Sequence, residues 1–341
     1  MRKFLWILLS FIGLFNISCK KNKTDTPTNI VLPTANLKIQ GSKIYMNSNP
    51  VQFIGANAFH SFSAGGFDTK SWNLDIIREF IGNMKENPIV GGAIKDANGS
   101  YLYALQTLVD SNRSHHQITI LCPFGWDGTS SSLFTGTDPS TSAWWKDYQN
   151  QIKSWAIQFK DQEDVWIEVY NEPYRYDRSD GYTDAQWTSD MNTMVGLIRN
   201  SGNPNIVLVP CAEQGQDESV LNNVGNNFLL GKTNILFDIH AYEKWLLVPN
   251  ANMGQRIQAL RKNQLPVFFG ELGPINASVL MDPGPFLDSV YQNHLSLCAW
   301  SWKYSDTDQD ALLNSKGTPN NFQNNNWGSI YQSLALKTRN P

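Results

Sequence analysis

Short apolar runs alternate along the chain with longer segments whose apolar residues recur at helical spacing. Eight of the runs have the length and composition of buried strands, at 51–57, 88–94, 118–124, 165–171, 205–210, 234–240, 266–271 and 296–302. Parallel strands need crossover connections, which are usually helices, so this alternation predicts a parallel sheet covered by helices. Eight strands within about 250 residues fit a closed (β/α)8 barrel better than an open, doubly wound sheet.

Apolar residues three and four positions apart place one apolar stripe on each predicted helix. The clearest stripes run over 74–84, 145–159 and 187–198, and Thr183 followed by Gln186 is typical of the start of the third helix. Further helices are expected at 102–112, 219–229, 253–263, 285–294 and 327–338, and a small hairpin at 37–50.

The first residues resemble an export signal. Arg2 and Lys3 precede an apolar run at 4–15, which is shorter than the roughly 20 residues that a membrane-spanning helix needs. The run ends in Asn-Ile-Ser-Cys, which resembles the lipobox of bacterial lipoproteins and would make Cys19 the lipidated first residue. We therefore expect a signal peptide at 1–18, a lipidated Cys and flexible tether at 19–35, and one folded domain at 36–341, in an exported protein that reaches the membrane through its lipid only.

Composition and charge exclude several classes of protein. With 27 basic and 30 acidic residues the formal net charge is −3, which does not favour a nucleic-acid partner. A chain with 41% hydrophobic and 17% charged residues can bury a large core, which excludes a disordered protein. The four cysteines and five histidines show no metal-binding spacing, and no glycine-rich phosphate-binding motif follows a predicted strand. We expect neither a metal nor a cofactor, and a monomer.

Two predicted strands end in a glutamate. The fourth ends in YNEP, with Glu172, and the seventh in FGELG, with Glu271. The C-terminal strand ends of such a barrel form the active-site face, so both carboxylates are expected at one mouth. A pair of carboxylates, one protonated as general acid and one ionised as nucleophile or base, is what glycoside hydrolysis requires. Glu168 faces the same way as Glu172 and is expected deeper, as a paired polar residue, while Glu213 beyond the fifth strand is a candidate substrate contact.

Four landmarks in this order resemble glycoside hydrolase family 5, the cellulase family within the clan of retaining barrel glycosidases. They are Asn-Glu-Pro on the fourth strand, His-Ala-Tyr at 240–242 on the sixth, Gly-Glu-Leu-Gly on the seventh and Ala-Trp at 299–300 on the eighth. The opening LKIQGSKIYMNSNPVQFIGANAF also resembles the family's N-terminal hairpin and first strand. The resemblance extends over about residues 36–338 and implies the same barrel.

The resemblance also implies a role for each matching residue. Glu172 would be the general acid/base, and Glu271 the nucleophile that forms a covalent glycosyl-enzyme. Asn171 would hydrogen-bond the 2-hydroxyl of the substrate, and Tyr242 would hold Glu271 in its ionised form. His240 would orient the acid/base region or the sugar.

Five tryptophans lie at, or in the loops beyond, the predicted C-terminal strand ends: Trp72, Trp126, Trp245, Trp300 and Trp302. The apolar faces of pyranose rings stack on aromatic rings, so this placement favours a sugar-binding cleft. The resemblance makes Trp300 the platform under the sugar at the cleavage point, and we expect Trp126 to be a further substrate contact.

The chain departs from the family pattern at two places. Many members carry an arginine on strand two near the nucleophile, but the predicted second strand, 88–94, contains none, and Arg78 lies upstream in the predicted helix. Either that helix is misplaced or the role of the arginine is absent. Family cellulases also often have a histidine at the end of strand three, which this chain lacks; His60, after strand one, could substitute for it in binding the substrate.

These features predict a retaining endo-β-glycosidase that hydrolyses β-1,4-linked glucan or a related plant polysaccharide by double displacement. A β-mannanase or another hemicellulase of the same barrel family is the alternative, and an enzyme that transfers the glycosyl group to another sugar would keep the same machinery. A non-catalytic glycan-binding lipoprotein is the rival from another class, and the retention of both acids argues against it. In each case the expected partner is a polysaccharide or an oligosaccharide.

Overall fold

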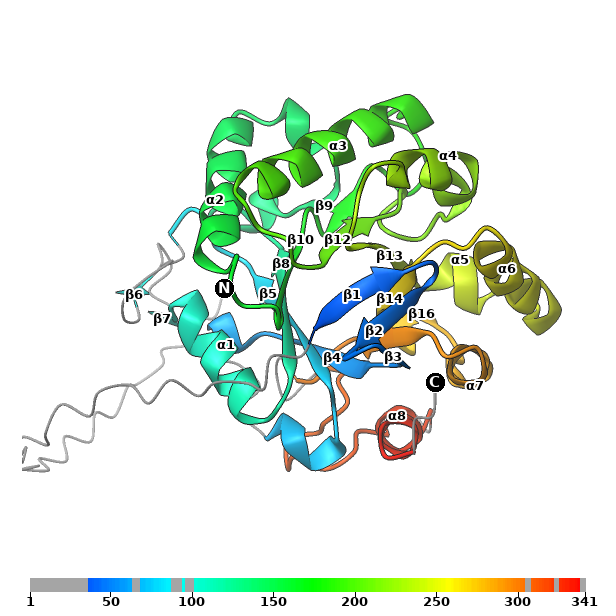
Figure 1. Cartoon of the computed structure of the whole chain (residues 1–341). Coiled ribbons are helices and arrows are strands. Elements are labelled where there is room, and N and C mark those ends of the chain that lie inside the picture. Colours follow the sequence, from blue (N-terminus) through cyan, green and yellow to red (C-terminus); the bar gives the residue numbers. More distant parts are fainter. Residues whose placement is uncertain are drawn as a thin grey trace, which may run out of the picture. The chain divides into compact units, whose positions relative to one another are not determined.

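Eight parallel strands close into a barrel in the computed structural model (Figure 1), which describes residues 36–62, 68–86, 94–95, 101–303, 308–321 and 325–337. Each strand pairs in parallel with the next, and the last pairs with the first to close the ring. In chain order they are β4 (Ile54–Ala58), β5 (Ile76–Ile81), β8 (Ile118–Pro123), β10 (Val165–Glu168), β12 (Val207–Pro210), β13 (Ile235–Ala241), β14 (Val267–Leu272) and β17 (Ser296–Ala299). The predicted (β/α)8 barrel is confirmed, and all predicted strands except the second overlap a strand of the ring.

Helices cover the outside of the barrel (Figure 1). They are α1 (Leu105–Ser114), α2 (Trp145–Gln158), α3 (Asp184–Asn200), α4 (Ser219–Leu229), the short α5 (Glu243–Leu246), α6 (Asn250–Lys262), α7 (Gly284–Gln292) and α8 (Trp327–Ala335). Their apolar stripes face the strands, so that Trp155 on α2 and Trp187 on α3 are fully buried. The hydroxyl of Thr183 accepts a hydrogen bond from the backbone N–H of Gln186 at 3.1 Å and caps α3, as the sequence predicted. The predicted helices are confirmed apart from the one at 74–84.

The second strand of the barrel was predicted in the wrong place. Residues 74–84 contain the strand β5, and of the segment 88–94 the structure describes only Ile94, which pairs with Leu102 outside the barrel. All six residues of β5 are buried, because one face lines the barrel interior and the other packs against surrounding elements. Apolar residues on both faces of a strand fall at three- and four-residue spacings by chance, which produced the apparent helical stripe. Among the described residues between β4 and β5 the connection contains only the 3-10 turns η1 (His60–Phe62) and η2 (Thr69–Trp72).

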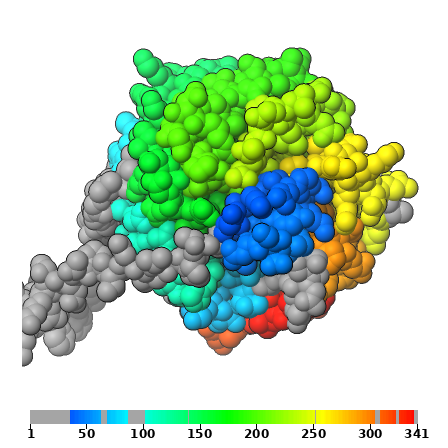
Figure 2. Space-filling view, viewed as in Figure 1, coloured from blue at the N-terminus to red at the C-terminus, as the bar shows by residue number. Residues whose placement is uncertain are grey.

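A small antiparallel sheet covers the N-terminal end of the barrel. The predicted hairpin is confirmed and gains a third strand, giving β1 (Leu37–Gln40), β2 (Lys43–Met46) and β3 (Asn49–Val51). Leu37 and Ile44 are buried in the same cluster as Phe53, Ile76 and other residues near the strand starts. Figure 2 shows these N-terminal residues, in blue, lying over the middle of this face. The C-terminal strand ends, where the two predicted carboxylates are expected, lie at the opposite end of the barrel.

Short elements beyond the C-terminal strand ends build the rim of that opposite end. The paired strands are β9 (Thr135–Thr137) with β11 (Glu172–Pro173), β6 (Ile94–Lys95) with β7 (Tyr101–Leu102), and β15 (Ile275–Asn276) with β16 (Val279–Leu280); the 3-10 turns are η3 (Ser130–Ser132) and η4 (Pro139–Thr141). The pairing of β11 with β9 fixes the backbone around the first predicted carboxylate, since the N–H of Glu172 donates to the carbonyl of Phe134 at 3.0 Å.

The described residues all fall within one compact unit, Val31–Pro341. The signal peptide at 1–18, the lipidated Cys19 and the tether at 19–35 lie outside the described residues and stay predictions. Within the described part of the chain, no helix is both long and apolar enough to cross a membrane.

Candidate active site

Glu172 and Glu271 meet at the C-terminal end of the barrel. Glu172 lies just beyond β10 and Glu271 lies in β14, and a carboxylate oxygen of each, together with a ring nitrogen of His240, lie within 4.8 Å of one another. Glu271 is buried, whereas Glu172 retains some exposure. Carboxyl groups about 5–5.5 Å apart are typical of retaining glycosidases, and inverting enzymes need about 6.5–9.5 Å to admit a water molecule. The observed separation fits direct attack by one carboxylate while the other handles the proton.

Two donors hold the carboxylate of Glu271. Nη1 of Arg78 donates to Oε1 at 2.7 Å, and the hydroxyl of Tyr242 donates to Oε2 at 3.0 Å. Burial raises the pKa of Glu271, the positive charges of His240 and Arg78 oppose that rise, and Glu172 adds to it. The two donors therefore favour the ionised form that a nucleophile needs, in a setting that would otherwise protonate it.

His240 connects the two acids. Its Nδ1 lies 2.9 Å from Oε1 of Glu172 and 3.6 Å from Oε2 of Glu271, and its Nε2 lies 3.5 Å from Oδ2 of Asp238. Burial alone would lower the pKa of His240, but Glu271, Asp238 and Glu172 raise it well above the ordinary value. A ring that carries a proton on Nδ1 donates to Glu172 and fixes that carboxyl group beside the nucleophile.

Arg78 is the central cation of the site, and the sequence did not place it there. Nε and Nη2 of Arg78 form a bidentate salt bridge with Glu168 at 2.6 and 2.9 Å. The same guanidinium also donates hydrogen bonds to Asn57, Asn171 and Glu271. It is fully buried, and the neighbouring acids raise its pKa well above the ordinary value despite that burial. The departure from the family pattern on strand two was therefore a misplaced strand. The signal that could have found it is the short run at 76–81, in which two charged residues, Arg78 and Glu79, interrupt an apolar stretch and fall on opposite faces of a strand.

Glu168 and Asp238 lie beneath the two principal acids. Burial raises the pKa of Glu168 to about 8, although the charge of Arg78 opposes the rise. Asp238 accepts a hydrogen bond from the backbone N–H of Gly270 at 2.6 Å, and a Cβ on that glycine would lie only 2.2 Å from Oδ2 of Asp238. Glycine is thus required immediately before Glu271 by the close approach of this carboxylate. Glu168 is a paired polar residue deep in the barrel, as its spacing from Glu172 indicated.

Asn171 is held just below Glu172. Its Oδ1 accepts from Nη2 of Arg78 at 2.9 Å, and its amide group donates to Oγ1 of Thr135 at 3.4 Å. The side chain is buried beside the acid/base candidate. Its contact with a substrate hydroxyl stays a prediction.

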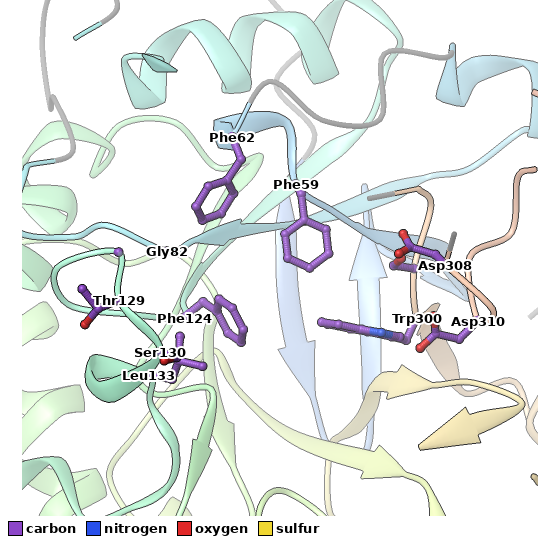
Figure 3. Close-up of a pocket in the computed structure, with 12 residues that line it drawn as sticks. Phe59, Phe62, Gly82, Phe124, Thr129, Ser130, Leu133, Trp300, Asp308 and Asp310 are labelled. Carbon is purple, nitrogen blue, oxygen red and sulfur yellow. The ribbon is translucent and has the colours of Figure 1, made fainter. Parts of the chain in front are cut away.

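Trp300 lies at the end of β17 among aromatic rings. Its ring centroid is 5.4 Å from that of Phe59 and 4.9 Å from that of Phe80, and its backbone N–H donates to the carbonyl of Leu272 at 2.7 Å, one residue after Glu271. A pocket of about 310 Å³ opens beside it (Figure 3). Aromatic side chains and two carboxylates are prominent in its lining, namely Phe59, Phe62, Phe124, Trp300, Asp308 and Asp310.

The tryptophans expected at the mouth divide into two groups. Trp126 and Trp300 are partly exposed, and the ring of Trp126 stacks on Trp144 at a centroid distance of 5.8 Å. The other three are buried, so the prediction that they line a sugar cleft was wrong. Trp72 packs edge-on against Trp302, and Trp245 packs against Phe269 and Phe286. Loops that return over the barrel end need an apolar core of their own, which these three rings supply.

Two other candidates are engaged away from the paired acids. Nδ1 of His60 lies 2.9 Å from Oε1 of Glu79, on the face of β5 opposite to Arg78. Glu213 is buried and forms ion pairs with Arg178 and Lys244, which join the loop after the fourth barrel strand to the loops after the fifth and sixth. Neither residue joins the cluster of Glu172, His240 and Glu271.

The acids and histidine of the site are already matched to protein partners. In the described part of the chain, the two groups close enough to hold a metal ion are Glu168 with Asp238 and His240, and Glu172 with His240 and Glu271. Arg78 forms ion pairs with members of both groups, namely Glu168, Asp238 and Glu271, so its guanidinium already supplies positive charge beside them.

A model of the cellulase family, glycosyl hydrolase family 5, matches residues 67–306, which is more than half of the chain. The chain belongs to glycosyl hydrolase family 5. It is also 26% identical over 156 residues to a mannan endo-1,4-beta-mannosidase from Cellvibrio japonicus, a match that spans 44% of this chain and 35% of that protein. This family 5 chain thus spans about a third of the curated relative.

Solved structures share the fold. A beta-mannanase from Streptomyces thermolilacinus with mannohexaose superposes with a TM-score of 0.66 at 18% identity, covering 89% of this chain and 99% of that one. The catalytic domain of an endoglucanase from Thermobifida fusca in complex with cellotetraose gives a TM-score of 0.64 at 16% identity, covering 88% and 97%. The family model confirms the expected family, and these structures show that the barrel fold extends over most of the chain.

Proposed function

We propose that this protein is a retaining endo-β-glycosidase that hydrolyses a β-1,4-linked hexose polysaccharide by double displacement. The observation that carries the proposal is the approach of Glu172 and Glu271 within 4.8 Å, each with a donor or a cation in contact. Membership of glycosyl hydrolase family 5 supports it.

In the first step Glu271 attacks the anomeric carbon, and Glu172 donates its proton to the glycosidic oxygen, so that the bond to the leaving sugar breaks as the covalent glycosyl-enzyme forms. In the second step Glu172 accepts a proton from a water molecule, which attacks the same carbon and releases Glu271. Two inversions return the original anomeric configuration.

The neighbours of each acid suit these roles. Arg78 and Tyr242 stabilise the ionised form of Glu271, so that no proton has to be removed from this carboxylate before it attacks. His240 holds Glu172 in place facing Glu271. The partial exposure of Glu172 gives it access to the water that the second step consumes.

Glucan and mannan have equal support as the polysaccharide. The sequence favoured β-1,4-glucan, whereas the curated relative is named a mannan endo-1,4-beta-mannosidase, and the structural neighbours include complexes with mannohexaose and with cellotetraose. Activity on a panel of barley glucan, carboxymethyl cellulose, xyloglucan and mannans, with product lengths measured over time, separates these substrates and distinguishes endo from exo action.

The central experiment compares the wild-type protein with Glu172→Gln and Glu271→Gln. Each variant should keep its melting temperature within a few degrees of the wild-type value and lose turnover by orders of magnitude. Proton NMR of the first product released by the wild-type protein should show the retained anomer. Binding of oligosaccharides without release of reducing ends by the wild-type protein would instead indicate a non-catalytic glycan-binding protein. Longer transfer products would indicate glycosyl transfer.

For the segment before the barrel we propose export and lipidation at Cys19, on the basis of the charged, apolar and Cys-terminated pattern at 1–19. The test expresses the full chain in a bacterium and follows its partition into detergent. Cys19→Ala should move the protein to the aqueous phase, and continued partition of the variant into detergent would refute lipidation.

A further inference from the structure

The pocket beside Trp300 carries negative charge but no described basic side chain. Asp308 and Asp310 lie on one side of it, and the remaining described lining residues are aromatic, aliphatic, hydroxyl-bearing or glycine. Figure 3 shows the carboxyl group of Asp310 next to the indole of Trp300. The pocket therefore offers apolar ring faces and hydrogen-bond acceptors side by side.

The backbone of Asp310 is fixed in place. Its carbonyl accepts hydrogen bonds from the N–H of Ser301 at 3.2 Å and from the indole N–H of Trp327 at 2.7 Å. A Cβ on Gly273, two residues after Glu271, would lie 3.7 Å from the Cβ of Asp310. Asp310 thus lies next to the end of β14, the strand that carries Glu271.

The side chain of Asp310 lies beside Trp300 and retains hydrogen-bond acceptor sites for a ligand. Its carboxyl group lies next to the indole of Trp300 (Figure 3), and interaction with that side chain lowers the pKa of Asp310. An ionised carboxylate has about four acceptor sites, so one indole N–H leaves others for a ligand. Burial raises the pKa of Asp310 to about 6, with contributions from Asp308 and Glu271, against the lowering by its hydrogen bonds.

We propose that Asp310 determines specificity by accepting a hydrogen bond from a hydroxyl of a neutral sugar ring that packs against Trp300. The inference rests on the proposed function and extends it, because it assigns a new contact and a class of sugar to the same site. A sugar that carries a carboxylate would meet the like charges of Asp308 and Asp310 and bind less well. The site therefore selects uncharged hexose units.

The test measures binding in a catalytically silent background. Glu172→Gln is titrated calorimetrically with mannohexaose and with cellohexaose at pH 5 and pH 7, alone and combined with Asp310→Asn or Asp310→Ala. Asn keeps an acceptor for the indole but removes the charge, whereas Ala removes both. The exposed Asp288 on α7 provides the matched control, Asp288→Asn.

We expect Glu172→Gln to bind its better ligand several-fold more tightly at pH 7 than at pH 5, since Asp310 ionises between them. Asp310→Asn should remove that pH difference, and Asp310→Ala should weaken binding about tenfold at pH 7, which corresponds to about 1.4 kcal/mol. Asp308, Tyr242 and Glu271, which also interact with Asp310, are unchanged in every protein compared and so contribute equally to the remaining pH dependence. The control, Glu172→Gln combined with Asp288→Asn, should bind with the same affinity as Glu172→Gln alone at both pH values.

A second measurement compares the same hexasaccharide with and without oxidation of C6 to a carboxylate. Glu172→Gln should bind the oxidised hexasaccharide more weakly than the neutral one, and adding Asp310→Asn should reduce this difference in affinity. Affinity, pH dependence and discrimination that all survive in Asp310→Ala would overturn the inference while leaving the proposed function intact. The proposed function fails separately, if the wild-type protein releases no reducing ends.

Discussion

The replacement of Arg78 by lysine tests the core of the site most directly. Arg78 makes five hydrogen bonds to oxygen atoms, of which three reach carboxylates and two reach the amide oxygens of Asn57 and Asn171. Lysine has three donors on one atom and no planar fork, so at least two of the five acceptors lose their partner. A lost hydrogen bond to a charged group costs about 1.5–3 kcal/mol, and breaking a buried ion pair costs about 3–5 kcal/mol.

We therefore expect Arg78→Lys to lower the free energy of unfolding by about 3–5 kcal/mol. The value is obtained from chemical denaturation followed by circular dichroism, with the slope against denaturant checked for constancy. Activity should fall further than stability explains, because Glu271 loses a donor: about 3 kcal/mol of lost transition-state stabilisation corresponds to roughly a hundredfold in kcat/KM.

The matched control is Arg113→Lys. Arg113 forms a similar two-pronged pair with Asp164, at 2.8 and 2.9 Å, but lies outside the active site. This variant should lose some stability and keep wild-type kcat. A double-mutant cycle with Glu168→Gln then isolates the buried pair, with an expected coupling above about 1 kcal/mol. If Arg78→Lys lowers the free energy of unfolding by less than about 1 kcal/mol and keeps kcat/KM within tenfold of the wild-type value, the bridging role of Arg78 is refuted.

Three further outcomes follow from the geometry. Tyr242→Phe removes a donor from Glu271, so the pKa of that carboxyl should rise and the acidic limb of the kcat/KM profile should move to higher pH, with kcat reduced roughly tenfold or more; an unmoved limb would contradict the contact. Gly270→Ala places a Cβ against Asp238 and should destabilise the fold by about 1–3 kcal/mol in denaturant titrations, and wild-type stability would show that the strand tolerates the close approach. Thr183→Ala removes the cap of α3 and should cost about 1 kcal/mol with kcat unchanged, whereas an altered kcat would show that α3 reaches the site.

The sequence predicted the barrel and its two principal acids because both depend on local signals. Apolar runs alternating with helical stripes are set by short-range spacing, and Glu172 and Glu271 each follow such a run directly. The topology then brings together residues almost a hundred positions apart without any contact having to be foreseen. His240 and Tyr242 were found through the resemblance to the family, because they match its His-x-Tyr at the end of the sixth strand of the barrel.

The wrong predictions concern features that are determined by burial in the folded protein and not by the spacing of apolar residues along the sequence. A strand buried on both faces has no alternation, so β5 was taken for a helix and Arg78 was left without a place on the sheet. The loop tryptophans show the same difficulty, because Trp245 and Trp302 are as apolar in sequence as Trp300. Only tertiary packing determines which of these rings is covered and which is left open to a ligand.

The closing contact of the ring joins segments from nearly opposite ends of the folded chain. β17 pairs with β4, with Leu297 opposite Ile54, and the side chain of Asn57 donates to the carbonyls of Gly270 and Ala299. During synthesis, β4 therefore waits for its final neighbour until almost the whole domain has left the ribosome. A chain cut short before β17 would leave two strand edges open to aggregation and would also lack Trp300. The enzyme site is thus assembled only when the last strand arrives, which couples activity to completion of the chain.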